Sequence, residues 1–246
     1  MNSTNKTALV TGSSSGIGFG VAKGFLDAGW NVVINARDPA RLQNAAKQLG
    51  SRAAMAVVAG ATTDAKTGEA MARAAIERFG SLDVLVNNAG EFGFKPFLDV
   101  TPEDLEHFLS VNLKGTYLTT QAVVRAMIAS GRGGSIVNIG TVLTDHGVSW
   151  VTASAPLVSK GGVRALTIAL AAELASQGIR VNAVSPGFIR TPLTAGADAT
   201  TLAGTALQGR IGDVTDIFGA VRYLADSTFV TGHVLNVDGG FVTGRR

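Results

Sequence analysis

Short apolar segments alternate with longer amphipathic segments along almost the whole chain, and this alternation limits the fold more than any other feature. The apolar segments are continuous runs rich in valine, isoleucine and alanine, as expected of strands buried on both faces of a sheet. The longer segments have the hydrophobic period of helices. Strands that alternate with helices form right-handed crossover units around a parallel sheet. The predicted strands are 7–11, 31–35, 53–58, 84–87, 135–139, 180–184 and 234–237.

The segments between these strands predict helices, and together they predict one Rossmann-like, doubly wound α/β domain that spans 1–246 and has a seven-stranded parallel sheet. No linker or repeat interrupts the pattern. The region 192–209 is the least regular and is rich in Ala, Thr and Gly, so it is either a substrate lid or a weak surface helix. The predicted helices are 16–28, 39–49, 66–79, 102–130, 156–177 and 214–225.

Composition excludes several classes of function. Hydrophobic residues make up 46% of the chain and charged residues 16%, which suits a large buried core. The chain has no cysteine, so disulfides and thiolate metal sites are excluded, and we predict no metal site. The net charge is only +3 and the basic residues are scattered, which disfavours binding to nucleic acid. We expect a soluble cytoplasmic protein with no signal peptide and no membrane span, acting on a small molecule.

A glycine-rich loop follows the first predicted strand and leads into the first helix. The segment 11–18 reads Thr-Gly-Ser-Ser-Ser-Gly-Ile-Gly. Its glycines allow a tight turn and close approach to a pyrophosphate, and the helix start offers free N–H groups. The loop could also be an ordinary turn, but its place in a strand–loop–helix unit favours a dinucleotide site. The predicted contacts here are Gly12, Ser14, Ser15, Gly16, Ile17 and Gly18.

The end of the second strand predicts the type of dinucleotide. An acidic residue at this place would hold the ribose hydroxyl of NAD, but the chain has Ala36 followed by Arg37. The guanidinium of Arg37 can pair with the 2′-phosphate of NADP. We therefore favour NADP(H) over NAD(H), although a solvated arginine near a helix start is also common.

Taken together, these motifs resemble the short-chain dehydrogenase/reductase family over about 7–240, nearly the whole chain. The glycine loop, "NNAG" at 87–90, Asn112 in "VNLKG", "SPG" at 185–187 and "FVTGHVLNVDGG" follow the order and spacing of the family. The resemblance implies that Asn88, Ala89, Gly90, Lys160, Pro186, Gly187, Ile189 and Thr191 also contact the cofactor. It implies an active site of Asn112, Thr141 and Lys160, and a homodimer or homotetramer.

The chain departs from the family pattern at positions of the catalytic residues. The family uses serine, tyrosine and lysine, and the corresponding residues here are Thr141, Pro156 and Lys160. Threonine retains a hydroxyl, and the lysine is present. A proline has no proton to donate, and it suits the first turn of a helix with Ser154 as its N-cap. We therefore expect a divergent member of the family that lacks the active-site tyrosine.

Another departure concerns the adenine end of the cofactor. Many family members carry an aspartate after the third strand, and here Gly60 stands at that place. The resemblance therefore implies that a contact to the adenine amine is lost and that cofactor binding is weakened.

Three classes of function remain open. The first is an NAD(P)(H)-dependent oxidoreductase that acts on the carbonyl or alcohol of a small apolar substrate and has an altered proton relay. The second is a lyase, isomerase or cyclase on the same fold, and the third is a catalytically silent nucleotide-binding protein. Water held by Lys160 and Asn112, or His146 oriented by Asp145, could replace the phenol as proton donor. An apolar pocket is expected from Phe92, Phe94, Phe97, Leu143, Trp150 and the region 192–209.

Overall fold

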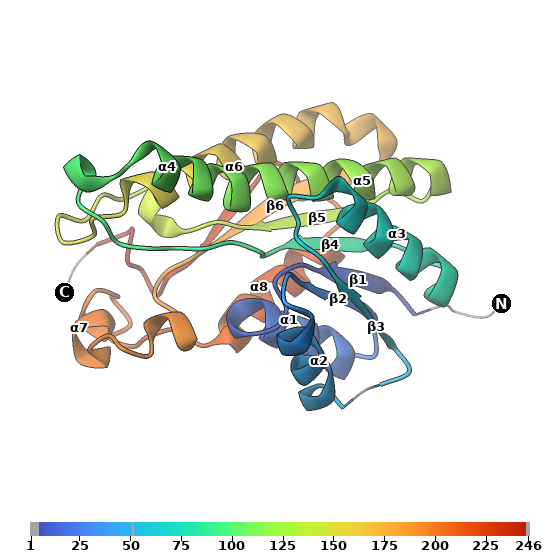
Figure 1. Cartoon of the computed structure of the whole chain (residues 1–246), viewed down its shortest axis with the longest axis horizontal. Coiled ribbons are helices and arrows are strands. Elements are labelled where there is room, and N and C mark those ends of the chain that lie inside the picture. Colours follow the sequence, from blue (N-terminus) through green and yellow to red (C-terminus); the bar gives the residue numbers. More distant parts are fainter. Residues whose placement is uncertain (1–4, 51, 245–246) are drawn as a thin grey trace.

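The computed structural model describes residues 5–50 and 52–244 and shows a three-layer α/β fold (Figure 1). A central sheet of seven parallel strands has the order β3-β2-β1-β4-β5-β6-β7. This confirms the predicted fold class. The strands are β1 (Thr7–Val10), β2 (Asn31–Ala36), β3 (Met55–Ala59), β4 (Val84–Asn87), β5 (Gly134–Ile139), β6 (Ile179–Pro186) and β7 (Val234–Val237).

Helices cover both faces of the sheet (Figure 1). One layer contains α3, α4, α5 and α6, and the opposite layer contains α1, α2 and α8. The α-helices are α1 (Gly16–Asp27), α2 (Pro39–Gln48), α3 (Ala65–Phe79), α4 (Pro102–Phe108), α5 (Gly115–Ser130), α6 (Ser154–Glu173), α7 (Ala199–Gly204) and α8 (Val214–Asp226).

Two hydrophobic cores hold these layers together, one on each face of the sheet. The core under α1, α2 and α8 centres on Phe25, whose ring packs on Trp30 and edge-on against Phe218 at a centroid distance of 5.3 Å. The core on the opposite face includes Met71 from α3 and Met127 from α5. Because successive residues of a strand point to opposite faces, the continuous apolar strands of the sequence supply both cores.

The order of the strands places the candidate site. Strand β1 pairs with β2 on one side and with β4 on the other, so the direction of winding reverses between β1 and β4. In open parallel sheets, ligands bind in the crevice at the carboxyl ends of the strands beside such a reversal. The glycine-rich loop follows β1, and the "NNAG" segment begins with the last residue of β4.

The long helix predicted at 102–130 is interrupted. It consists of α4, a π-helical turn at Leu109–Lys114, and α5. The wide turn contains Asn112, whose side chain bonds to the backbone of Glu91. The local period of the sequence is that of an α-helix throughout, so this tertiary interaction could not be read from it.

Helix α6 begins earlier than predicted. Its N-cap is Ala153, which supplies no side-chain cap, and Ser154 is already the first helical residue. Pro156 lies in the first turn, where a missing N–H is tolerated. The predicted capping role of Ser154 is therefore wrong, while the predicted place of the proline is confirmed.

In the described part of the chain, none of the helices combines the length and apolar character that crossing a bilayer requires.

Candidate active site

A cavity of about 440 Å³ opens at the carboxyl ends of β1, β4, β5 and β6. It brings together the glycine-rich loop, the segment after β4, the end of β5, Lys160 of α6 and the segment after β6. Of the predicted cofactor contacts, its lining includes Gly12, Ser15, Gly16, Ile17, Asn88, Ala89, Gly90, Lys160, Pro186, Gly187 and Thr191.

The glycine-rich loop is shaped by close backbone contacts. Gly12 has a φ of 64°, and a Cβ placed on it would lie 2.8 Å from Cα of Ala89. A Cβ on Gly18 would lie 2.3 Å from Nδ2 of Asn88. The Asn88 amide in turn donates to the carbonyls of Thr11 and Gly12, at 3.0 and 3.1 Å. These glycines are required because β4, the loop and α1 meet there without room for side chains.

The start of α1 faces the same cavity. Ser15 is its N-cap and makes no side-chain bond to the first amides of the helix, so these amides and the positive end of the helix dipole are available to an anion. Gly18, one turn into the helix, does not line the cavity. Its part in the site is to allow the close packing of Asn88, not to contact the ligand directly.

A second cavity, of about 280 Å³, continues from the first beyond the ends of β2 and β3. Ser14 and Arg37 line it, and Arg41, which we did not predict, lines it too. Asp38 is also in the lining, but its Oδ1 atom caps α2 by accepting from the amides of Ala40 and Arg41. This cavity therefore holds two guanidinium groups at the place where a dinucleotide carries its adenosine half.

Glu91 lies where the two cavities meet, and its role was not anticipated. Its carboxylate lies 3.6 Å from the guanidinium of Arg37 and 2.8 Å from Nε2 of His107. The sequence signal that could have revealed this role is that Glu91 is a charged residue directly after the "NNAG" motif. The carboxylate is therefore the counterion of Arg37 in this structure.

Gly60 borders the second cavity at the end of β3. Its φ of 155° and the hydroxyl of Thr67, which would lie 2.4 Å from an added Cβ, exclude larger residues in this conformation. The Nδ2 atom of Asn35 donates to the carbonyls of Val58 and Gly60 and so joins the ends of β2 and β3. The backbone here is arranged for a glycine, not for the family's aspartate.

Asn112 is fully buried and lies behind the wall of the first cavity. Its Oδ1 atom accepts from the amide of Glu91 at 2.7 Å, and its Nδ2 atom donates to the Glu91 carbonyl and to Oγ of Ser159, each at 2.9 Å. The hydroxyl of Thr116 donates to the Asn112 carbonyl. The side chain of Asn112 therefore fixes the segment after "NNAG" against α6 and does not itself reach the cavity.

Lys160 lies in the second turn of α6, is partly buried, and lines the first cavity. Its Nζ atom donates to the carbonyl of Ile139, the last residue of β5, at 2.8 Å. The same nitrogen would lie 3.2 Å from a Cβ on Gly90. Burial lowers the pKa of Lys160 from its ordinary value of 10.5 to about 8, because the ammonium is poorly solvated there.

Thr141 follows β5 and lines both the first cavity and a neighbouring apolar cavity. Its Oγ1 atom accepts from the amide of Leu143 at 3.3 Å, so its hydroxyl hydrogen is free to donate to another acceptor. Pro156 is buried and is absent from the lining of both cavities. Where the family pattern places a phenol, this site therefore offers no side-chain donor.

The apolar cavity has a volume of about 210 Å³ and has no charged residue in its lining. The rings of Trp150 and Phe188 stack at a centroid distance of 5.8 Å, and those of Phe92 and Phe94 meet edge to face. Of the expected pocket residues, Phe92, Phe94, Leu143 and Trp150 line this cavity, together with Leu193, Thr194, Ala197 and Leu202 from the region 192–209.

Two expected residues of this region lie elsewhere. Phe97 lines a neighbouring cavity beyond Leu143. His146 lines that same cavity, and its ring packs edge-on against Phe241, while Asp145 pairs with Arg164 instead of orienting the imidazole. His146 therefore does not line the cavity that holds Lys160, and this geometry does not support the alternative in which it replaces the phenol as proton donor.

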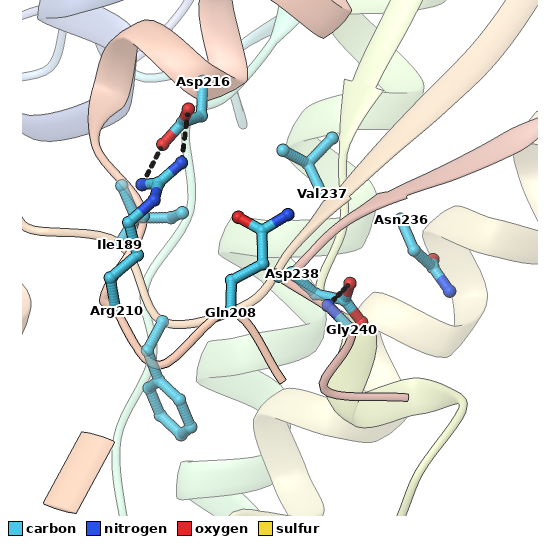
Figure 2. Close-up of a pocket in the computed structure, with 11 residues that line it drawn as sticks. Ile189, Gln208, Arg210, Asp216, Asn236, Val237, Asp238 and Gly240 are labelled. Carbon is cyan, nitrogen blue, oxygen red and sulfur yellow. Dashed lines mark hydrogen bonds and ion pairs between the residues drawn. The ribbon is translucent and has the colours of Figure 1, made fainter. Parts of the chain in front are cut away.

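Ile189 also differs from its predicted place. It lines the apolar cavity and a separate pocket under β7, but neither of the two cofactor-side cavities (Figure 2). In that pocket the guanidinium of Arg210 faces the carboxylate of Asp216 and makes two bonds to it, of 2.8 and 3.0 Å. Its Asp238 carboxylate accepts from the amides of Gly240 and Val242. This pocket is thus held by an internal ion pair and a turn, and it is separate from the cavity that holds Lys160.

The glycine-rich loop, the free amides of α1 and the two arginines beside it fit a bound dinucleotide. A doubly wound parallel sheet with these features defines a dinucleotide-binding α/β protein.

Comparison with known proteins narrows this class. Residues 12–242 match the family model described as enoyl-(acyl carrier protein) reductase. The chain is 37% identical over 252 residues to the 3-oxoacyl-[acyl-carrier-protein] reductase of Chlamydia muridarum, with 98% of this chain and 99% of that protein covered. The chain therefore belongs to the short-chain dehydrogenase/reductase family, whose members bind nicotinamide cofactors.

Solved structures agree with this assignment. A short-chain type dehydrogenase/reductase from Mycobacterium marinum has a TM-score of 0.89 and 34% identity, with 96% of this chain and 95% of that chain covered. ElxO, solved with NADP bound, has a TM-score of 0.90 and 28% identity, with 98% and 100% covered.

Proposed function

We propose that this protein is an NADP(H)-dependent oxidoreductase that interconverts a carbonyl and an alcohol on a small, uncharged, apolar substrate. The observation that carries the proposal is the position of Thr141, which lines both the cofactor-side cavity that holds Lys160 and the apolar cavity beside it. A hydroxyl donor at this junction can hold a carbonyl oxygen while the rest of the substrate fills the apolar cavity.

The preference for NADP(H) is supported by Arg37 and Arg41, which both line the adenosine side of the groove. A 2′-phosphate can pair with guanidinium groups, whereas the ribose hydroxyls of NAD are better held by a carboxylate. Asp38 is already engaged in capping α2. The NADP-bound ElxO structure supports the same preference by similarity.

In the proposed reaction, each of three residues of the chain has a different role. A bound nicotinamide supplies or accepts the hydride. The hydroxyl of Thr141 donates a hydrogen bond to the substrate oxygen and stabilises the negative charge that develops on it. Lys160 places a positive charge at the same wall of the cavity, and Asn112 keeps the segment after "NNAG" in position against α6.

The apolar cavity supports an uncharged substrate with few hydroxyl groups. A carboxylate, phosphate or polyol would lose its hydration in this cavity and find few side-chain partners, namely the hydroxyls of Thr141, Thr191 and Thr194 and the indole N–H of Trp150. An aliphatic or aromatic group instead gains from contact with the rings of Trp150 and Phe92.

The proton relay of this proposal differs from the family pattern, because Pro156 provides no donor. The same observation favours a second candidate, a lyase, isomerase or cyclase that uses the fold without net hydride transfer. The two candidates differ in one measurable property: only the oxidoreductase changes the nicotinamide absorbance in proportion to product.

A second copy of the chain is proposed as its partner. The helices α5 and α6 expose several large apolar side chains, including Tyr117, Ile128, Val158 and Ile168. Burying such residues between copies would form a homodimer or homotetramer.

Two measurements test the proposed function. Titration with NADPH and with NADH, followed by nicotinamide fluorescence, should show tighter binding of NADPH. Incubation with NADPH and a panel of apolar ketones should then give alcohol and oxidised cofactor in equal amounts. Binding of neither nucleotide would contradict the proposal, and product without any change in the cofactor would favour the non-redox candidate.

A further inference from the structure

The proton donor of the reaction can be sought among the ionisable groups that reach the site. In the described residues, only Lys160 and Glu91 contribute ionisable side chains to the lining of the cofactor-side cavity, and none contributes to the apolar cavity. Reduction of a carbonyl needs a proton at the oxygen, so one of these groups, or water, must supply it.

Glu91 is poorly placed for this role. One of its carboxylate oxygens faces Arg37 and the other lies 2.8 Å from Nε2 of His107. Arg37 lines only the cavity on the adenosine side, and His107 lines neither cavity. A carboxylate held between two bases is an acceptor and not a proton donor.

The other titratable side chains with suitable chemistry lie outside the site. His146 faces the cavity beyond Leu143. Tyr117 on α5 and Tyr223 on α8 are 50% and 55% exposed, and neither lines a cavity of the site. The chain has no other tyrosine. No phenol or imidazole therefore takes the place left by Pro156.

Lys160 has the geometry of a donor. An ammonium carries three N–H donors, and within the described chain one of these is used, in the bond to the Ile139 carbonyl. Two N–H groups remain on a nitrogen that faces the cavity, close to Gly90. Ile139 and Thr141 are two residues apart at the end of β5, so the ammonium and the Thr141 hydroxyl belong to the same wall of the site.

We propose that Lys160 is itself the proton donor of carbonyl reduction in this protein, directly or through one water; this rests on the proposed function. As hydride reaches the carbonyl carbon, the C=O π pair becomes a lone pair on oxygen. An N–H bond of the Lys160 ammonium breaks and an O–H bond forms, which leaves an alcohol and a neutral amine. The amine recovers its proton from solvent through the open cavity. In alcohol oxidation the neutral amine accepts the proton.

The pKa of Lys160, lowered by burial to about 8, agrees with this role. An acid is most effective when its pKa lies near the working pH, because it is then both protonated and ready to release its proton. The reduction rate should therefore be constant below pH 8 and fall as pH rises through about 8, since the ammonium is lost. Alcohol oxidation needs the neutral amine and should rise over the same range.

Lys160→Arg and Lys160→Met provide the matched test. Arginine keeps the positive charge and hydrogen-bonding capacity but does not release a proton at these pH values. Methionine removes both properties. Reduction of an apolar ketone is measured in single turnovers at saturating NADPH from pH 6 to 10, and NADPH affinity is measured separately by fluorescence. Both variants should lose about 10²–10⁴ in rate and lose the fall above pH 8.

An independent readout follows the lysine itself. In protein labelled at the lysine ε-carbons, the signal absent from Lys160→Arg identifies Lys160, and its shift is titrated with NADPH bound. We expect the midpoint of this titration and the midpoint of the rate profile to coincide.

The inference would be overturned if the reduction rate did not change across the pH range in which Lys160 titrates, or if the Lys160→Arg variant kept the wild-type rate. Either result would leave the proposed function intact. If NADPH binds but no ketone is reduced at any pH, both fail together.

Discussion

The Nζ atom of Lys160 lies 2.8 Å from the carbonyl oxygen of Ile139, and this contact joins the first turns of α6 to the carboxyl end of β5. It holds a poorly solvated ammonium group that has one carbonyl partner and, among residues 5–50 and 52–244, no carboxylate partner. Such an arrangement is unfavourable for folding at neutral pH, because the lysine is more easily charged when it is in water. A group with this property indicates function more than stability.

The first prediction concerns stability and pH. The folded state lowers the pKa of Lys160 from 10.5 to about 8, so between these values the unfolded state binds more protons. Stability therefore rises with pH across this window, and below pH 8 the group destabilises the fold by up to about 3 kcal/mol. Lys160→Met should be more stable than the wild type at pH 7.

Urea unfolding of both proteins from pH 7 to 10.5 measures this effect. The difference in free energy of unfolding should shrink as pH rises and vanish near 10.5. A difference that does not depend on pH would mean that the ammonium is well solvated in the folded state.

The second prediction concerns the choice of cofactor. Arg37→Gln should weaken NADPH binding by about 10- to 100-fold, the range expected for losing a charge-assisted bond, and leave NADH binding nearly unchanged. Fluorescence titration with both nucleotides measures the ratio. Arg73→Gln, which removes the same charge from the exposed face of α3, is the control. Equal losses for both nucleotides would refute a 2′-phosphate contact.

The third prediction concerns Gly60. Gly60→Ala should destabilise the protein by about 1–3 kcal/mol, because its φ of 155° disfavours a side chain and an added Cβ would lie 2.4 Å from the Thr67 hydroxyl. Gly219→Ala, on the exposed face of α8 with open space around it, should instead gain about 0.5–1 kcal/mol. Thermal unfolding of both variants separates the two effects, and a neutral Gly60→Ala would show that the loop relaxes.

The fourth prediction restores the missing phenol. If the site performs hydride transfer, Pro156→Tyr should raise ketone reduction, by up to about 10²–10⁴ if the phenol becomes the main acid. Ala172→Tyr, at an exposed position farther along the same helix, is the control for adding a tyrosine to α6. Thermal unfolding checks that the variant still folds. A folded Pro156→Tyr protein without increased turnover would favour a site adapted to other chemistry.

The fifth prediction concerns the substrate. Trp150 is half exposed and stacks on Phe188 at the edge of the apolar cavity. Trp150→Ala should raise KM for aromatic ketones about tenfold or more through lost ring contact, with a smaller effect for short aliphatic ketones. Phe229→Ala removes a fully exposed ring elsewhere and should change neither constant. Equal effects on both ketone classes would place the substrate away from Trp150.

Most of the fold could be predicted from the sequence, because parallel strands buried on both faces are continuous apolar runs. The bounds of β4 and β7 agree with the prediction, and the other strands differ by one or two residues at one end or, for β3 and β6, at both ends. The π-helical turn around Asn112 could not be predicted, since its cause is a side-chain contact with Glu91, which is distant in sequence.

The parts of the candidate site that local backbone motifs form could be predicted from the sequence. The contacts between side chains from distant segments were harder to predict. The glycine loop and Lys160 lie together in the cofactor-side cavity as the motifs indicated. Glu91, Phe188 and the Ser159 hydroxyl that holds Asn112 were missed, because their roles depend on three-dimensional proximity. His146, which was one of the possible donors, lines a different cavity, because closeness to Thr141 along the chain does not bring it to the site.

The chain segments that line the apolar cavity determine how the substrate selectivity of this fold can change. Apart from Ile17, Phe92 and Phe94, the residues that line it come from the segments that follow β5 and β6, whereas the adenosine side of the groove is built by β1 to β4 and their loops. Substrate selectivity and binding of the adenosine half of the nucleotide thus depend on largely separate segments of the sequence. Transplanting 142–150 and 194–202 from another member, which leaves the residues that line the cofactor-side cavity in place, should therefore redirect this chain toward new reactants.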